Sequence, residues 1–179
     1  MLIVSSLQAE GLFRVISGGQ TGVDRGALDA ALGVGVPCGG WCPFGRRAED
    51  GIIPPRYPVT ELSGAGYDER TQKNVEDSDG TLVITFGPAS GGTLRTIEIC
   101  RQLGRPHLIV DAATVPLEEA TRRATQFVAE EGIQQLNVAG PRASGEPRGY
   151  EFAYSVVREL CRQFGAAWCG NRVHQPNSA

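Results

Sequence analysis

The sequence predicts an α/β fold: a single Rossmann-like, doubly wound domain with a mostly parallel sheet of about five or more strands and helices on both faces. Short apolar runs typical of buried strands alternate with segments of helical periodicity. Glycine-rich loops follow three of these runs, and 179 residues with 41% hydrophobic composition suffice for one sizeable core. Because a helix between two strands returns the chain to the starting end of the sheet, this order gives parallel strands, joined by right-handed crossovers. We expect an N-terminal lead-in at 1–11, a ligand-binding domain at 12–165 and a polar C-terminal tail at 166–179.

The first strand and helix flank the most glycine-rich turn. The apolar run 12–16 leads to three glycines within five residues, and an alanine-rich helix is expected at about 23–32, ended by Gly33 or Gly35. A helix N-terminus carries unpaired N–H groups and partial positive charge, and glycines let the backbone approach a phosphate closely. The turn is therefore a candidate anion site, although a turn that needs glycine only for its dihedral angles would have the same sequence.

Residues 34–57 show neither a helical nor a strand period and contain much glycine and proline. A loop of this length inside a compact domain is uncommon unless it is functional. We expect its charged side chains, Arg46 among them, to lie beside Trp41 and Phe44, whose rings could stack on a flat ligand. An Ω-like surface loop, in which both rings fill only its own underside, is the structural alternative.

The rest of the chain continues the alternation of strands and helices. After a short strand at 57–62, a helix capped by Asp68 should run to about 77, with polar residues that are typical of a solvated face. Those residues are Arg70, Thr71, Lys73 and Asn74. The later expected elements are a strand at 81–86, a helix at 93–103 with Leu94, Ile97 and Cys100 facing inward, a strand at 107–110, an amphipathic helix at 116–131 whose apolar side includes Leu117, a strand at 135–139 and a helix at 150–164.

Three glycine loops are expected to converge, because the carboxyl ends of parallel strands meet at one edge of a sheet. The loops at 18–22, 90–93 and 140–144 would then lie where ligands of doubly wound folds bind. This edge predicts a cleft for a small phosphate-bearing ligand, and the sequence leaves open which loop takes the phosphate. The candidate binding residues are Gly18, Gly19, Gln20, Thr21, Gly22, Asp24, Arg25, Arg46, Ser90, Gly91, Gly92, Thr93 and Arg142.

Composition argues against several partners. A net charge of −3 offers no basic field for nucleic acid. No stretch approaches ~18 consecutive apolar residues and the N-terminus lacks a signal-peptide pattern, so neither membrane insertion nor export is expected. Five cysteines without a Cys-x-x-Cys pair do not suit a disulfide scaffold, which favours a reducing cytoplasm.

No catalytic residue can be assigned from the sequence. The two histidines, His107 and His174, belong to no Ser–His–Asp or Cys–His arrangement. Asp24 and Arg25, in the first turn of the first helix, form the best charged pair near the ligand. The histidines and cysteines have no metal-ligand spacing, so we expect no directly bound metal and any metal would arrive inside a cofactor.

Several motifs, taken together, resemble one known family over about 15–160. The motifs are GGQTGVDRGA at 18–27, GWCP at 40–43, GRRAEDG at 45–51, SGGT at 90–93 and LNVAGPR at 136–142. They resemble the putative molybdenum carrier family, a circularly permuted branch of the Rossmann-like superfamily that includes the LOG and lysine-decarboxylase-like proteins. The resemblance implies a homodimer or homotetramer that carries molybdenum cofactor, a pterin with a phosphate at one end and a dithiolene-held oxo-molybdenum at the other. Molybdoenzymes would be its recipients.

One departure from the related enzymes separates the functional hypotheses. LOG-type phosphoribohydrolases carry P-G-G-x-G-T-x-x-E, whose glutamate works near the ribose, whereas Thr96 stands at that position here. Glu98 lies about 200° further round a helix and cannot simply substitute. Two hypotheses remain: a carrier or storage protein for molybdenum cofactor, and a nucleotide-binding sensor or nucleoside-monophosphate phosphoribohydrolase, a nucleotide N-glycosidic hydrolase.

Overall fold

The computed structural model describes residues 12–64 and 66–165. The predicted lead-in and tail lie outside these residues, as does His174. The elements in chain order are β1 (Arg14–Ile16), α1 (Val23–Val34), β2 (Cys38–Pro43), the 3-10 helix η1 (Phe44–Arg46), β3 (Arg47–Ala48), β4 (Gly51–Ile52), β5 (Val59–Leu62), α2 (Tyr67–Glu76), β6 (Gly80–Thr85), α3 (Gly91–Gln102), β7 (His107–Asp111), α4 (Leu117–Glu130), β8 (Gln135–Ala139) and α5 (Gly149–Gly165).

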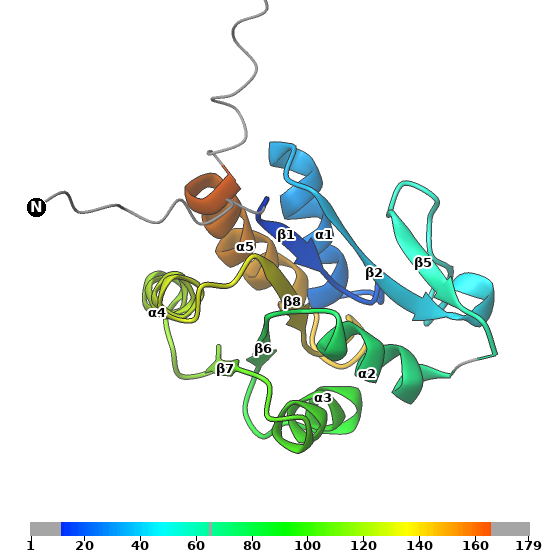
Figure 1. The fold of residues 1–179 in the computed structure, drawn as a ribbon. Coiled ribbons are helices and arrows are strands. Elements are labelled where there is room, and N and C mark those ends of the chain that lie inside the picture. The colour runs from blue at the N-terminus through cyan, green and yellow to red at the C-terminus, as the bar shows by residue number, and fades with distance from the viewer. Residues whose placement is uncertain (1–11, 65, 166–179) are drawn as a thin grey trace, which may run out of the picture.

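Six strands form one parallel sheet in the order β5-β2-β1-β8-β6-β7. Strands β3 and β4 form a separate antiparallel hairpin. Helices α1, α4 and α5 cover one face of the sheet, and α2 and α3 cover the other (Figure 1). The predicted doubly wound α/β fold is therefore confirmed.

The larger core lies between the sheet and the helices α1, α4 and α5. The small residues of α1, among them Ala27 and Ala31, are fully buried. Small residues also let α1 approach α5 closely. At Gly26, for example, an added Cβ would lie 2.4 Å from the carbonyl oxygen of Tyr150. As predicted, α1 is followed by a left-handed glycine, Gly35. The opposite face has a much smaller apolar cluster beneath α2 and α3.

The segment 34–57, predicted as one long loop, contains the internal strand β2 and the β3–β4 hairpin. Glycines and prolines hide the period of β2, although it pairs with both β1 and β5. Gly40 is required by its φ of +135° and by close packing, since a Cβ there would lie 2.2 Å from the carbonyl oxygen of Ser17. The prediction of one long loop was wrong, because Gly40 is required for close packing within a strand and does not mark a loop.

Two details of the helices also correct the predictions. Gly66, not Asp68, is the N-cap of α2, and its N–H donates to the Glu69 carboxylate at 2.9 Å. Leu94 and Leu117, predicted to face inward, are 40% and 41% exposed. In α3 the threonines of the first turns point inward, toward a polar cleft, while Ile97 and Cys100 are buried as predicted.

Candidate functional site

A cleft of about 500 Å³ opens at the carboxyl edge of the sheet. It is lined by the β1–α1 loop, one side of α2, the β6–α3 loop with the first turns of α3, and the β8–α5 loop. After β1 the chain continues to β2 on one side of the sheet, and after β6 it continues to β7 on the other side. The β1–α1 and β6–α3 loops therefore run in opposite directions from the two neighbours of β8. Such a switch point is where ligands of doubly wound folds bind, and the volume suits a small molecule.

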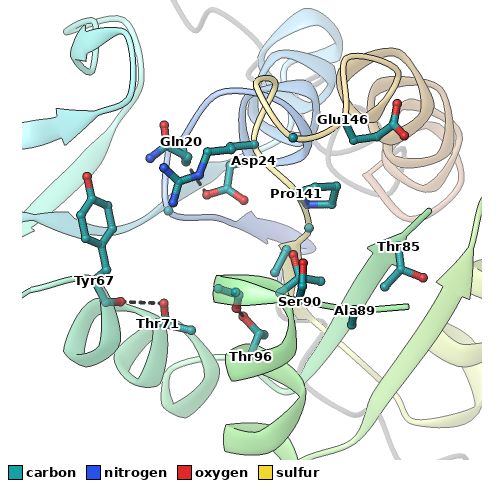
Figure 2. A pocket seen from close by; sticks show the side chains of 18 of the residues that line it. Gln20, Asp24, Tyr67, Thr71, Thr85, Ala89, Ser90, Thr96, Pro141 and Glu146 are labelled. Atoms are coloured by element: carbon teal, nitrogen blue, oxygen red, sulfur yellow. Dashed lines mark hydrogen bonds between the residues drawn. The ribbon is translucent and has the colours of Figure 1, made fainter. Parts of the chain in front are cut away.

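The structure divides the predicted binding residues into two groups. Those that line the cleft are Gly18, Gln20, Asp24, Ser90, Gly91, Gly92, Thr93 and Arg142. Those outside its lining are Gly19, Thr21, Gly22, Arg25 and Arg46. Figure 2 shows Gln20 and Asp24 above Thr71 of α2, with Tyr67 of α2 to the left and Ser90 and Thr96 of the α3 end of the cleft to the right.

The start of α1 is covered by the protein itself. The carbonyl oxygen of Pro141 accepts the N–H of Val23 at 3.3 Å. A Cβ on Gly22 would lie 2.5 Å from that same oxygen and 2.8 Å from the backbone nitrogen of Ala143. Gly19 has a φ of +77° and packs against Ile53. Gly22 therefore serves close packing with the β8–α5 loop, and Gly19 serves turn geometry beside Ile53, in agreement with the plainer of the two sequence interpretations.

The start of α3 is open. A Cβ built on Gly91 or Gly92 would meet no atom within 4 Å, although both residues line the cleft. The first intrahelical bond runs from the Leu94 N–H to the Ser90 carbonyl at 3.2 Å, and the Ser90 side chain makes no capping bond. The preceding N–H groups and the positive end of the helix dipole thus face the cleft. This is the geometry that binds phosphate at helix N-termini.

Two arginines expected at the ligand are used to hold the chain together. The Arg46 guanidinium donates to four backbone carbonyls, those of Ile53, Pro54, Tyr57 and Val59, at 2.7–3.1 Å. Arg25 donates to the Gly19 carbonyl at 3.1 Å and forms an ion pair with Asp50 at 2.5 Å. Both side chains therefore have acceptors within the protein and lie outside the cleft lining, and their predicted contact with a ligand stays a prediction.

A charged pair lies on the wall that α1 and α2 share. Nη1 of Arg70 lies 3.5 Å from Oδ2 of Asp24, which also accepts the Gln20 N–H at 3.2 Å. The Arg70 guanidinium packs where a Cβ of Gly18 would be, and its buried Nε has no hydrogen-bond partner within the described chain. Burial raises the pKa of Asp24, and the Arg70 charge and the Gln20 N–H only partly oppose it. Arg70 also lines the cleft and brings its positive charge to this wall.

Helix α2 is fixed to the sheet by one buried amide. After Ile16 the backbone of β1 leaves β2, and its last bond is from the Ser17 N–H to the Gly39 carbonyl at 2.9 Å. The Asn74 side chain continues the pairing, since it accepts the Trp41 N–H at 2.7 Å and donates to the Trp41 carbonyl at 3.0 Å. The Asn74 side chain thus bonds to β2 as a neighbouring strand would, and these bonds set the position of α2 and therefore of Arg70.

Sequence reasoning missed part of the lining. Arg70, Thr71 and Asn74 were assigned to a solvated helix face, because a polar cleft and bulk water select the same residues. Their i, i+1 and i+4 spacing was visible, but only the fold shows which surface faces the cleft. Further lining residues outside the predicted set include Tyr67, Asp68, Thr85, Phe86, Thr96, Asn137 and Glu146.

Metal and membrane features are absent from the part of the chain that the structure describes. Across 12–64 and 66–165, no three His, Cys, Asp or Glu side chains gather as they would around a metal ion. Within the same ranges, no helix combines the length and apolar character needed to cross a bilayer.

The parallel sheet and the open α3 start at its switch point define a Rossmann-like protein with a small-molecule cleft. Residues 15–161 match the model of the circularly permutated YpsA SLOG family, and the chain belongs to that family. It is also similar to a crystal structure titled "Putative molybdenum carrier protein" from Syntrophus aciditrophicus SB, with 40% sequence identity and a TM-score of 0.80 over 83% of this chain and 96% of the other. No curated protein matches the chain.

Proposed function

We propose that this protein binds a phosphate-bearing small molecule in the cleft and that this ligand is molybdenum cofactor, which the protein carries or stores. The observation that carries the proposal is the open N-terminus of α3 inside a cleft of about 500 Å³. A similar protein bears the name of a molybdenum carrier, which supports the choice of ligand.

The residues of the cleft fit such a ligand. The N–H groups at Gly91–Thr93 would hold the phosphate through backbone contacts and the helix dipole. Arg70 and Arg142 supply two positive charges on the lining. The molybdenum would arrive within the cofactor, held by its dithiolene, so the protein need supply only binding and shielding. Molybdoenzymes in the cytoplasm would be the recipients.

The alternative is a nucleotide sensor or phosphoribohydrolase that uses the same cradle. Thr96, in the position of the LOG glutamate, is buried beside the cleft and donates to the Gly92 carbonyl at 2.9 Å. Glu98 lies outside the cleft lining and pairs with Arg95 at 3.4 Å. A hydrolase would therefore need another carboxylate of the cleft, Asp24, Asp68 or Glu146, to replace the missing glutamate, and this favours binding without turnover.

The test is to incubate purified protein with the common nucleoside monophosphates, to follow release of free base, and to titrate it with molybdenum cofactor in parallel. We expect saturable binding of the cofactor, protection of the cofactor from oxidation and no base release. Multiple turnovers with a nucleotide, together with no protection of the cofactor, would overturn the carrier function. Asp24→Asn would then show whether Asp24 is the catalytic carboxylate.

A further inference from the structure

A carboxylate outside the cleft lining joins the segments that build one of the cleft walls. Glu49 lies at the turn between β3 and β4, and its side chain is only 18% exposed. Its Oε1 accepts hydrogen bonds from the Thr21 hydroxyl and, at 3.1 Å, from the Ser144 N–H. Its Oε2 accepts the Ser144 hydroxyl and lies 3.9 Å from Nε of Arg142. One side chain therefore bridges the β1–α1 and β8–α5 loops.

The backbone that carries Glu49 is itself fixed to α1 and its preceding loop. The Glu49 N–H donates to Oε1 of Gln20 at 3.0 Å, and the same oxygen accepts the Thr21 N–H at 3.0 Å. The next residue, Asp50, forms a two-bond ion pair with Arg25 at 2.5 and 2.8 Å. The hairpin turn is thus anchored twice, so the carboxylate is presented from a rigid support.

The loop that Glu49 holds has two effects on the site. Residues 141–146 supply Arg142, Ser144 and Glu146 to the cleft lining and also cover the start of α1. Within the loop, the N–H groups of Gly145 and Glu146 share the Arg142 carbonyl, both at 3.0 Å. Against the rest of the protein, the Ala143 N–H donates to the Thr21 hydroxyl at 3.1 Å, and that hydroxyl in turn donates to Glu49. Ser144 is connected to the β1–α1 loop through Glu49, whereas Ala143 and Pro141 bond directly to Thr21 and Val23.

We infer that Glu49 is a positioning residue for the ligand cleft, which acts through Ser144 and Thr21 to hold the β8–α5 loop as one wall of the cleft and as the cover of α1. The α1 start is then closed by the protein, and α3 is left to receive the anion. The inference rests on the proposed function only where it concerns ligand affinity.

Electrostatics keep Glu49 ionised for this task. Burial alone would raise its pKa, but the hydrogen bonds from Ser144 and Thr21 and the charge of Arg142 hold the pKa below the usual value. The charged groups around the hairpin turn are Arg142 on the loop, and Asp50 and Arg25, which neutralise each other. Acid should therefore release the loop only when the pH falls through this lowered pKa.

Amide hydrogen exchange tests the inference without any ligand. In Glu49→Ala, we expect the amides of Ala143 and Ser144 to exchange at least tenfold faster, with amides of β6 and α4 unchanged. In the wild type, protection of the two amides should fall as the pH drops through the Glu49 pKa, whereas Glu49→Gln should lack this step. Glu61→Gln is the matched control, because Glu61 accepts the Gly45 N–H at 2.7 Å in the same region but does not touch the loop.

Equilibrium titration with molybdenum cofactor and with AMP gives the second readout. Glu49→Ala should bind whichever probe the wild type binds at least tenfold more weakly, and adding Ser144→Ala should cause little further loss, because both changes break the same connection. Unchanged exchange at the two amides, or faster exchange throughout the protein, would overturn the positioning role. If the wild type binds neither probe, the proposed function fails, while the exchange experiment still decides the role of Glu49.

Discussion

At the scale of single residues, glycines with similar sequence neighbours do different work. Gly19 has left-handed geometry and packs against Ile53, whereas Gly92 has ordinary geometry and faces open space in the cleft. We expect Gly92→Val to reduce ligand affinity more than tenfold by filling the phosphate site, with stability changed by no more than about 1 kcal/mol. Gly19→Val should lower the free energy of unfolding by about 1–3 kcal/mol through backbone strain.

Urea denaturation and ligand titration of both glycine variants separate these effects. A Gly92→Val protein that binds as tightly as the wild type would remove the start of α3 from the site. The two glycines cannot be told apart in the sequence, because close approach to a ligand and left-handed backbone geometry both require glycine. Only the contacts of Pro141 and Ile53, which are distant in the chain, distinguish the covered loop from the open one.

Asp24 should have a measurable effect on the pH dependence of stability. Burial raises its pKa in the folded protein. Its protonation therefore stabilises the fold fully below the unfolded-state pKa, and this contribution is lost as the pH rises through the folded-state pKa. We expect the free energy of unfolding to fall across that interval in the wild type and to lack this step in Asp24→Asn. Urea denaturation over a series of pH values measures it, and superimposable profiles would contradict it.

At the scale of elements, an irregular stretch of sequence forms an internal strand of the sheet. The segment 34–57 carries no strand period, yet β2 within it pairs on both sides. The helices around the larger core were predictable because their apolar residues repeat. Helix α2 was predicted as an element, but its role was not, since the residues that face the cleft are as polar as those that face water.

The attachment of α2 through Asn74 gives a prediction for this element. Asn74→Ala would leave the N–H and carbonyl of Trp41 without these partners, and loss of a buried hydrogen-bonded group costs about 1–3 kcal/mol. We expect a loss of stability in that range and weaker ligand binding, because Arg70 is carried by the same helix. Gln72→Ala, which removes an exposed pair with Glu76 on α2, is the control and should change stability by less than about 0.5 kcal/mol. Equal losses in the two variants would contradict the anchoring role of Asn74.

At the scale of the whole molecule, the order of strands and helices was enough to predict the parallel sheet and the edge where its loops meet. The covering of α1 and the contribution of α2 to the cleft could not be predicted, because they depend on contacts between segments far apart in the sequence. The family resemblance that the sequence motifs indicate is confirmed, because the chain belongs to the circularly permutated YpsA SLOG family.

Assembly is a further property of the whole molecule. We expect a homodimer or homotetramer with closed symmetry, since isologous pairing is the commonest solution. The apolar side of α5 is buried against α1 and α4, whereas Leu94 of α3, Leu103 just after it and Ile109 of β7 are exposed, so α3 and β7 are better placed for subunit contacts than α5. Light scattering at micromolar concentration measures the mass, and a monomer would count against this expectation.

The most direct measurement is a crystal structure of the protein with molybdenum cofactor or with a phosphate-bearing ligand that copurifies with it. We expect the phosphate to accept hydrogen bonds from the backbone N–H groups at Gly91–Thr93, the rest of the ligand to lie between α2 and the β8–α5 loop, and the start of α1 to remain covered. A phosphate bound at 18–22 with the β8–α5 loop displaced, or a ligand bound outside the cleft, would contradict the proposed site.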